Sequence, residues 1–213
     1  MSQQRGETGR SQARRAELIA TGRRLFADTA YDALSMDDIA RQAGVAKGLI
    51  YYYFKSKRGY YLAIVEDSVA ELVAQAGGNT ELPRAERVRR TIEGYLRYAE
   101  HHQAAYRTIV TGGVGSDAEV LAIRDGVREE LAATIAEGAY GTRKIPELAR
   151  LGLVGWLGAV EDITLDWIAG RTEPQSPSRE VLGAMLVRLL RATLGTIGEF
   201  VPECPAPPVV EPV

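Results

Sequence analysis

One short stretch decides the fold of this chain: Gly44-Val45-Ala46-Lys47-Gly48-Leu49-Ile50-Tyr51-Tyr52-Tyr53-Phe54. It ends in four consecutive aromatic residues, Tyr51 to Phe54. Successive residues of a helix point about 100° apart, so these side chains fan over more than half of its circumference. A single face cannot bury all of them. Part of this aromatic, hydroxyl-bearing surface must face outward beside Lys47 and Gly48, where it suits a phosphate-bearing partner.

The residues just before this stretch predict a second short helix that turns into it. Ser35 is a good N-cap, and Asp38, three residues later, can complete a capping box. Gly44 predicts the end of this helix, because a residue in the left-handed conformation commonly follows the last turn. After a turn through Val45, the next helix is expected over about 46–54. Two short helices joined by a glycine-containing turn describe a helix-turn-helix.

Apolar residues recur at helical spacing along nearly the whole chain, without a convincing alternating strand pattern, so we predict an all-α fold. Gly77-Gly78-Asn79 interrupts this pattern and divides the chain into predicted domains at 11–76 and 80–200. The proline-rich residues 201–213 are expected to be a disordered tail. The other predicted helices cover about 11–29, 58–75, 83–103, 103–112, 117–139, 146–170 and 178–199.

Charge is distributed unevenly along the chain. Residues 1–58 contain 11 Lys or Arg and 6 Asp or Glu, a balance of 11 − 6 = +5; the rest contains 15 and 22, or −7, giving the total of −2. A basic N-terminal end favours an anionic partner there. The single cysteine, Cys204, fits a reducing cytosol, and we find neither a signal peptide nor an apolar run long enough to span a bilayer. We therefore expect a cytoplasmic protein without a membrane partner.

In a helix-turn-helix the second helix lies in the major groove of DNA, and the first crosses the phosphate backbone. Ile50 and Phe54 can help to form the small core that fixes the two helices. Gly48 lets the backbone approach DNA closely, and Tyr51 and Tyr52 offer hydroxyls to phosphates and rings to sugars or thymine methyls. Tyr53 is left between the edge of the domain and a phosphate. Further phosphate-binding candidates are Ser35, Lys47 and Lys57.

The segment from about Leu18 to Leu62 resembles the DNA-binding domain of TetR-family transcriptional regulators. The residues that carry this resemblance are Leu25-Phe26, Ser35-Met36-Asp37-Asp38-Ile39-Ala40, Ala43-Gly44-Val45, Lys47-Gly48, Ile50-Tyr51-Tyr52-Tyr53-Phe54 and Lys55-Ser56-Lys57. The resemblance implies that DNA is faced by Ser35, Lys47, Gly48, Leu49, Tyr51, Tyr52 and Lys57. It also implies double-stranded operator DNA as a partner, with an all-helical C-terminal domain that pairs two protomers and binds a small-molecule effector.

Two positions depart from the family pattern. Ala46 stands where the family often has Ser or Thr as helix cap and phosphate donor, and alanine loses both roles at a capping cost of about 0.5–2 kcal/mol. Leu49 stands where a base-facing polar residue is frequent, and contact with a thymine methyl is the plausible substitute. We therefore expect the operator preference, rather than DNA binding itself, to differ from that of relatives.

The last two long predicted helices carry broad apolar surfaces, which either pair two protomers or close the core of one. Gly152, Gly155 and Gly158 recur every third residue in the first of them, although each costs about 1 kcal/mol relative to alanine. Close approach of another helix or room for a ligand can offset this cost. On the same helix Glu161, Asp162 and Asp166 form an acidic group. It favours a cationic effector, unless it is a solvated face or an interface salt bridge.

The effector pocket is poorly marked in the sequence. The candidate ligand contacts are Tyr95, Tyr98, Tyr106, Trp156 and Trp167, although aromatic residues at this spacing are also typical of a core. The adjacent histidines, His101 and His102, lack the partners of a metal site, and no nucleophile, base and orienting acid share a recognisable spacing. We expect neither catalysis, metal nor cofactor. The alternatives to a ligand-responsive repressor are an effector-independent DNA-binding or helical interaction protein and, given a catalytic cluster that we do not find, an all-helical enzyme.

Overall fold

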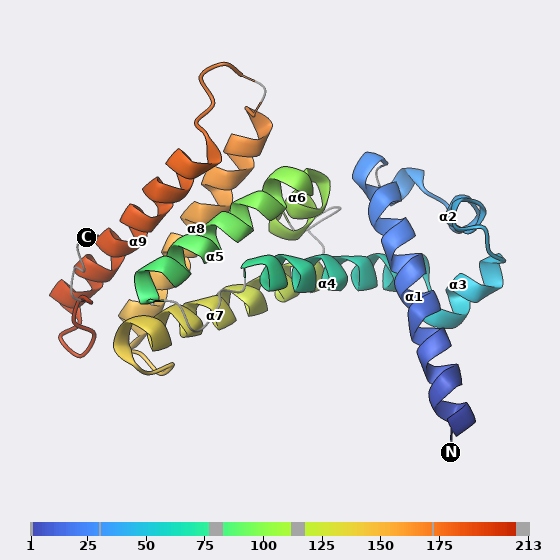
Figure 1. Cartoon of the computed structure of the whole chain (residues 1–213), viewed down its shortest axis with the longest axis horizontal. Coiled ribbons are helices and arrows are strands. Elements are labelled where there is room, and N and C mark those ends of the chain that lie inside the picture. The colour runs from blue at the N-terminus through green and yellow to red at the C-terminus, as the bar shows by residue number, and fades with distance from the viewer. Residues whose placement is uncertain (1, 30, 77–82, 112–117, 172, 208–213) are drawn as a thin grey trace. The chain divides into compact units, whose positions relative to one another are not determined.

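A computed structural model describes residues 2–29, 31–76, 83–111, 118–171 and 173–207 of the 213-residue chain (Figure 1). These residues form helices, turns and bends but no strand, which confirms the all-α prediction. The elements are α1 (Ser2–Asp28), the 3-10 helix η1 (Tyr31–Ala33), α2 (Met36–Ala43), α3 (Lys47–Phe54), α4 (Lys57–Ala76), α5 (Arg84–His101), α6 (Gln103–Thr111), α7 (Ala118–Tyr140), α8 (Glu147–Ala169) and α9 (Arg179–Phe200). Helix α1 begins nine residues earlier than the predicted start at Ser11.

Helix α2 is capped at both ends as its sequence predicts. The Ser35 hydroxyl accepts a hydrogen bond from the Asp38 backbone, and the Asp38 carboxylate accepts one from the Ser35 backbone. Gly44 adopts the left-handed conformation with φ 62° and ψ 36°, and its N–H reaches the carbonyls of Ala40 and Arg41. These caps satisfy backbone groups that an eight-residue helix would otherwise expose at its ends.

Helices α1 and α4 pack closely in the N-terminal core. The Tyr60 hydroxyl donates a hydrogen bond to the Leu18 carbonyl, and burial raises the pKa of Tyr60 to about 12. A Cβ atom on Gly22 would lie less than 3.0 Å from Ile64 and Tyr60, so this crossing requires a glycine. The core that holds the helix-turn-helix contains Leu18, Ile19, Met36, Ile39, Ala40, Ile50, Phe54, Tyr60, Ala63 and Ile64.

The chain divides into two compact units. Unit 1 contains Met1–Glu71 and His102–Leu121, and unit 2 contains Leu72–His101 and Ala122–Val213. This division differs from the predicted domains because α6 packs against α1 and so belongs with the N-terminal helices. The predicted boundary at residues 77–79 lies outside the described residues.

In unit 2, α9 packs against α5 and α8. Glu100 at the end of α5 binds Arg171 and Arg179, which flank the connection between α8 and α9. Burial opposes ionisation of Glu100, but the hydrogen bonds and charges of the two arginines outweigh it and hold its pKa below the ordinary value. The buried residues of α9 are Leu182, Gly183, Leu186, Leu190, Leu194 and Ile197.

The three glycines of α8 have different surroundings. A Cβ on Gly152 would lie 2.9 Å from Ile197 of α9, so this glycine allows a close helix approach. A Cβ on Gly158 would lie 3.0 Å from the Arg128 guanidinium, so this glycine makes room for a side chain of α7. At Gly155 a Cβ would meet nothing within 4 Å. Close packing therefore accounts for two of the three glycines within the protomer.

The expected disordered tail is partly ordered. Val201 and Cys204 are buried, the Cys204 N–H bonds to the Val201 carbonyl, and residues 201–207 turn back over Gly198. Burial raises the pKa of the Cys204 thiol. Two apolar side chains thus anchor a segment whose proline content predicted disorder, while residues 208–213 lie outside the described residues.

One helix of unit 2 has the length and composition of a membrane span. Among the described helices, α9 is long and apolar enough, by length and composition, to span a bilayer. Arg188 and Arg191 interrupt the apolar residues of this helix, so they do not form one continuous apolar run in the sequence. A third of the apolar window is buried inside the protein, and core helices of soluble proteins meet the same criterion, so this helix alone is weak evidence for a membrane span.

Candidate nucleic-acid interface

Helix α3 divides its aromatic run between the core and the surface. Ile50 is fully buried and Phe54 is nearly so, which confirms that these two residues lock the helix pair. Tyr51 and Tyr52 are 40% and 67% exposed, so among the described residues they belong to the large hydrophobic side chains that face outward. The outer face of α3 therefore carries the aromatic, hydroxyl-bearing surface that the sequence predicts.

Tyr53, whose role the sequence left open, has a partner inside the protein. It is half-buried, and its hydroxyl oxygen lies 3.2 Å from the hydroxyl oxygen of Ser11 on α1. Its ring also contacts Tyr52 edge-on, with ring centroids 5.1 Å apart. Tyr53 thus joins the end of the recognition helix to α1.

Two of the predicted phosphate donors are engaged within unit 1. The Lys47 ammonium donates to the Asp37 carboxylate at 2.8 Å, and this hydrogen bond raises the pKa of Lys47. The Ser35 hydroxyl donates to Asp38. Both pairs are exposed, where interactions of this kind are weak, so an incoming phosphate can displace either partner.

The N-terminus of α3 is open to solvent. Ala46 occupies the N-cap and makes no side-chain hydrogen bond to the helix, as its sequence predicts. Gly48 is exposed, and a Cβ there would meet nothing within 4 Å, so packing within the protein does not require a glycine. Leu49 is half-buried beside them. Free backbone N–H groups at a helix N-terminus favour an anion.

The turn from α3 to α4 contains features that the sequence analysis did not single out. Lys55 has a positive φ of 65°, and its ammonium donates to the Tyr52 carbonyl at 2.9 Å. A Cβ on Gly59 would lie well under 3.0 Å from the Phe54 carbonyl oxygen. Lys57, a predicted phosphate ligand, places its ammonium 4.2 Å from the centroid of the Tyr31 ring. Tyr31 lies on η1, 26 residues before Lys57, so no local sequence pattern predicts this contact.

The five predicted ligand contacts are divided between the two units. Tyr106 belongs to unit 1, whereas the other four belong to unit 2. Trp167 has a structural role, because its indole N–H donates to the Pro177 carbonyl at 3.0 Å and the Arg171 guanidinium lies 4.9 Å from its ring centroid. Tyr95 is half-buried and Tyr98 is fully buried on α5.

Trp156 is different from Trp167. Its side chain is buried, yet its indole N–H finds no hydrogen-bond partner among the described residues. The Thr164 hydroxyl, two turns further along the buried face of α8, is in the same state. A buried polar group without a partner costs about 1–3 kcal/mol, so each such group needs an explanation such as a water molecule or a ligand.

The acidic group on α8 separates into a buried and an exposed part. Glu161 pairs with Arg128 of α7 at 2.6 Å, and burial raises its pKa although the arginine opposes this. Asp162 and Asp166 are exposed.

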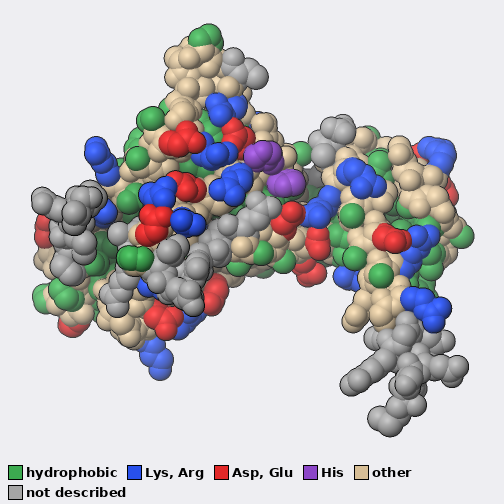
Figure 2. Space-filling view, viewed as in Figure 1, with side chains coloured by type: hydrophobic (Ala, Val, Ile, Leu, Met, Phe, Trp, Pro, Cys, Tyr) green, Lys and Arg blue, Asp and Glu red, His purple; other side chains and the backbone are tan. Residues whose placement is uncertain are grey.

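His101 and His102 are also exposed (Figure 2). No group of three or more His, Cys, Asp or Glu side chains within the described ranges is arranged to hold a metal ion.

Comparison with known proteins identifies the family. The model of bacterial regulatory proteins of the tetR family matches residues 18–64, which run from α1 into α4. The model of the tetracyclin repressor-like C-terminal domain matches residues 84–193, more than half of the chain. The chain belongs to the TetR family. This family consists of bacterial regulatory proteins, and the curated relatives that match the chain are named as HTH-type transcriptional regulators.

Individual relatives agree with this assignment. The chain is 32% identical over 111 residues to the transcriptional activator FasR of Mycolicibacterium smegmatis, over 51% of each chain. It is 29% identical over 115 residues to the transcriptional regulator EthR of the same organism, over 50% of this chain and 53% of EthR. The chain thus spans about half the length of these curated relatives.

Solved structures share the fold of this TetR-family chain. A TetR-family regulator from Streptomyces coelicolor is 25% identical, with a TM-score of 0.76 over 91% of this chain and 85% of that one. FadR of Bacillus subtilis, solved in complex with stearoyl-CoA, has a TM-score of 0.66 over 82% of this chain and 96% of its own. Its 18% identity supports a common fold only.

Proposed function

We propose that this TetR-family regulator is a homodimeric repressor that binds operator DNA through α3 and releases it when a small molecule binds the C-terminal domain. The observation that carries the proposal is the exposed face of α3, where Gly48, Tyr51 and Tyr52 point outward from a helix pair locked by Ile50 and Phe54. A rigid helix with open N-terminal amides and tyrosine hydroxyls fits a major groove bordered by phosphates.

The DNA contacts can be tested with a double variant. Lys47→Ala with Tyr52→Ala removes an exposed ammonium and the most exposed ring of α3, while the buried core of the domain is untouched. We expect operator binding in a gel shift to be lost and the helical circular dichroism to be retained. An unchanged affinity in this variant would refute the assignment of α3 to DNA.

A second copy of the chain is the proposed occupant of the outer faces of α8 and α9. Five large apolar side chains lie there between 40% and 62% exposed: Leu148, Leu151, Val181, Met185 and Leu189. Gly155 leaves open space among them, which suits the close approach of a partner helix. A two-fold pair of this kind would present two copies of α3 to half-sites about one helical turn apart.

The dimer can be tested by sedimentation equilibrium. Met185→Glu with Leu189→Glu should convert the dimer to a monomer, because it would bury two charges in the interface. Val73→Glu is the matched control, since Val73 is 43% exposed and lies on α4 rather than on α8 or α9. A double variant that sediments as a dimer would contradict this interface.

The effector site is proposed to lie beside Trp156, in the interior of unit 2. A ligand oxygen that accepts from the indole N–H would remove the cost of that unpartnered donor. The stearoyl-CoA bound to the structurally similar FadR favours a ligand with a long apolar part as the first probe. In a Trp167→Phe variant, Trp156 is the only tryptophan, because the chain has two.

Stearoyl-CoA titrated into that variant should shift the Trp156 fluorescence. It should also weaken DNA binding, by the same factor by which DNA weakens the binding of stearoyl-CoA. DNA binding that no compound of a broad panel weakens would favour an effector-independent regulator.

The name of FasR makes activation the second mode of action. Reporter expression that falls, rather than rises, when the gene is deleted would establish an activator. We also propose a cytoplasmic location, with the apolar face of α9 covered by a second copy rather than by lipid.

A further inference from the structure

The N-terminal part of α1 extends beyond the helix-turn-helix. Helix α1 has 27 residues, about 40 Å at 1.5 Å per residue, and between Gly9 and Glu17 none of its residues is buried. The first turns continue past α3 (Figure 1). The match to the family's N-terminal model begins only at residue 18, so this extension lies outside it.

Contacts with α3 hold the described part of this extension in place. Ser11 lies 3.2 Å from the Tyr53 hydroxyl, and the Arg15 guanidinium lies 5.3 Å from the centroid of the Phe54 ring. Ser11, Arg15 and Leu18 are spaced by four and three residues, so they form one stripe that faces α3 and the core. The extension is therefore docked against the side of the last turn of α3.

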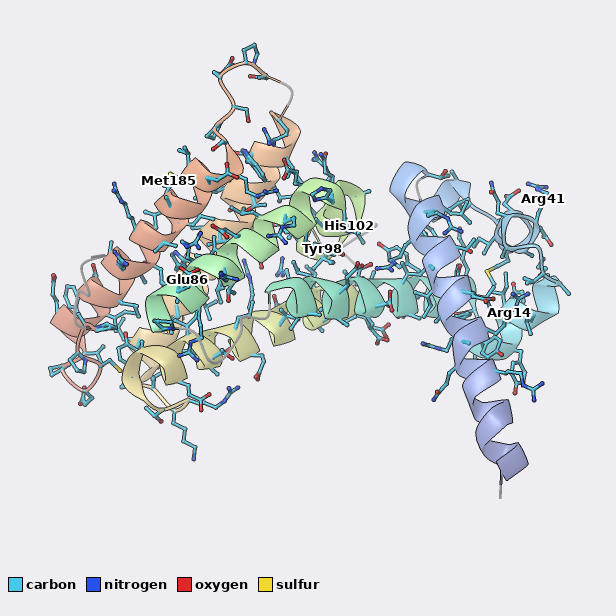
Figure 3. The ribbon with its side chains drawn as sticks, viewed as in Figure 1. Arg14, Arg41, Glu86, Tyr98, His102 and Met185 are labelled. Atoms are coloured by element: carbon cyan, nitrogen blue, oxygen red, sulfur yellow. The ribbon has the colours of Figure 1, made fainter. Side chains whose placement is uncertain are left out.

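A second stripe lies next to the docked one and is basic. Arg10 and Arg14 are four residues apart and exposed, and each lies about 100° around the helix from the docked stripe. Thr21 continues their line and borders a shallow groove together with Gln42 of α2. The two arginines thus lie on the side of α1 that α2 occupies, and Figure 3 labels Arg14 on this helix.

The opposite side of α1 is neutralised by the protein itself. Arg23 pairs there with Asp67 at 3.5 Å and with Glu71, both on α4. Arg14 forms an exposed pair with Glu17 of the same helix, at 2.6 Å. An exposed pair of this kind is weak and can be replaced by a phosphate.

We propose that Arg10 and Arg14 bind the DNA phosphate backbone beside the groove that α3 enters. The inference rests on the proposed DNA contact of α3. An α-helix fills the major groove, so a helix docked against its side lies over the strand that borders the groove. Phosphate contacts add affinity and fix orientation without reading sequence, so these arginines extend the footprint but do not alter operator preference.

The test uses the full-length protein and DNA selected by it from a random pool. Arg10→Gln with Arg14→Gln retains helix-forming residues, and Arg97→Gln with Arg107→Gln, at two exposed arginines of α5 and α6, is the matched control. The plot of log affinity against log salt has a negative slope, and each lost phosphate contact should make it less steep by about 0.9. Four arginines in a dimer would change the slope by up to ~3.6. The hydroxyl-radical footprint should shorten at its flanks, and the selected sequence should stay the same.

The outcomes separate the two proposals. An unchanged slope and footprint in the Arg10/Arg14 variant, with normal wild-type binding, would overturn this inference and leave α3 as the DNA contact. A changed sequence preference would also overturn it, because it would mean base contact instead of phosphate contact. Failure of the wild type to enrich any DNA would overturn the proposed function and this inference together.

Discussion

Gly59 offers the sharpest test of how the recognition helix is positioned. A Cβ at this position would lie well under 3.0 Å from the Phe54 carbonyl oxygen, a backbone atom that cannot rotate away. The α3–α4 turn must therefore open in a Gly59→Ala variant. The Gly59 N–H would also move away from the Ser56 hydroxyl, which accepts its hydrogen bond at 2.9 Å.

The size of the effect follows from three contributions. Overpacking of this kind costs about 1–3 kcal/mol. The weakened hydrogen bond costs about 0.5–1.5 kcal/mol, whereas alanine in a helix gains about 0.5–1 kcal/mol over glycine. We expect a net loss of about 1–3 kcal/mol in the free energy of unfolding. Because Phe54 ends α3, the same change should displace the recognition helix and weaken operator binding.

Urea denaturation and a gel shift measure the two effects, with Gly48→Ala as the control. A Cβ on Gly48 would meet nothing within 4 Å, so this variant should gain about 0.5–1 kcal/mol of stability. It should still bind DNA less well if backbone approach at Gly48 matters. Gly59→Ala with unchanged stability and unchanged affinity would show that the turn does not constrain α3.

Three further predictions concern other parts of the chain. Ala46→Ser should supply the missing N-cap of α3 and raise the melting temperature, with about 0.5–2 kcal/mol of added stability; an unchanged melt would contradict the capping argument. The Glu100 pKa is lower in the folded than in the unfolded state, so its stabilisation is complete above its ordinary value of 4.5 and is lost as pH falls through the folded value. Glu100→Gln should flatten this acid-side loss in melts from pH 7 to 3, and an identical pH profile would exclude the group. Trp167→Phe, which loses a hydrogen bond, should destabilise more than Trp156→Phe, which removes an unpartnered N–H, and urea midpoints in the reverse order would contradict these roles.

Much of the helix-turn-helix could be predicted because its signals are local. The Ser35 and Asp38 capping box and the left-handed Gly44 each depend on residues within a few positions, and the structure reproduces them. The division of the aromatic run follows from helical geometry, which places Ile50 and Phe54 on one face. The family resemblance rested on these same residues and is confirmed.

The ligand site could not be read in the same way. An aromatic side chain at helical spacing has the same sequence signature whether it fills a core or contacts a ligand. Trp167 and Trp156 differ only in what lies opposite each indole N–H, and that depends on the path of the chain between α8 and α9. Likewise, Glu161 and Asp162 are neighbours in sequence, but only Glu161 meets the Arg128 side chain of α7.

By itself the sequence determined an all-helical regulator with a helix-turn-helix at its N-terminal end, because caps, glycine stops and helical periodicity act over a few residues. Only the tertiary structure decided which side chains remain available for partners. It joined Tyr53 to Ser11, grouped α6 with α1, filled the space at Gly152 and Gly158, and left Gly155 open. These outcomes depend on contacts between residues far apart in the chain, for which a local pattern carries no information.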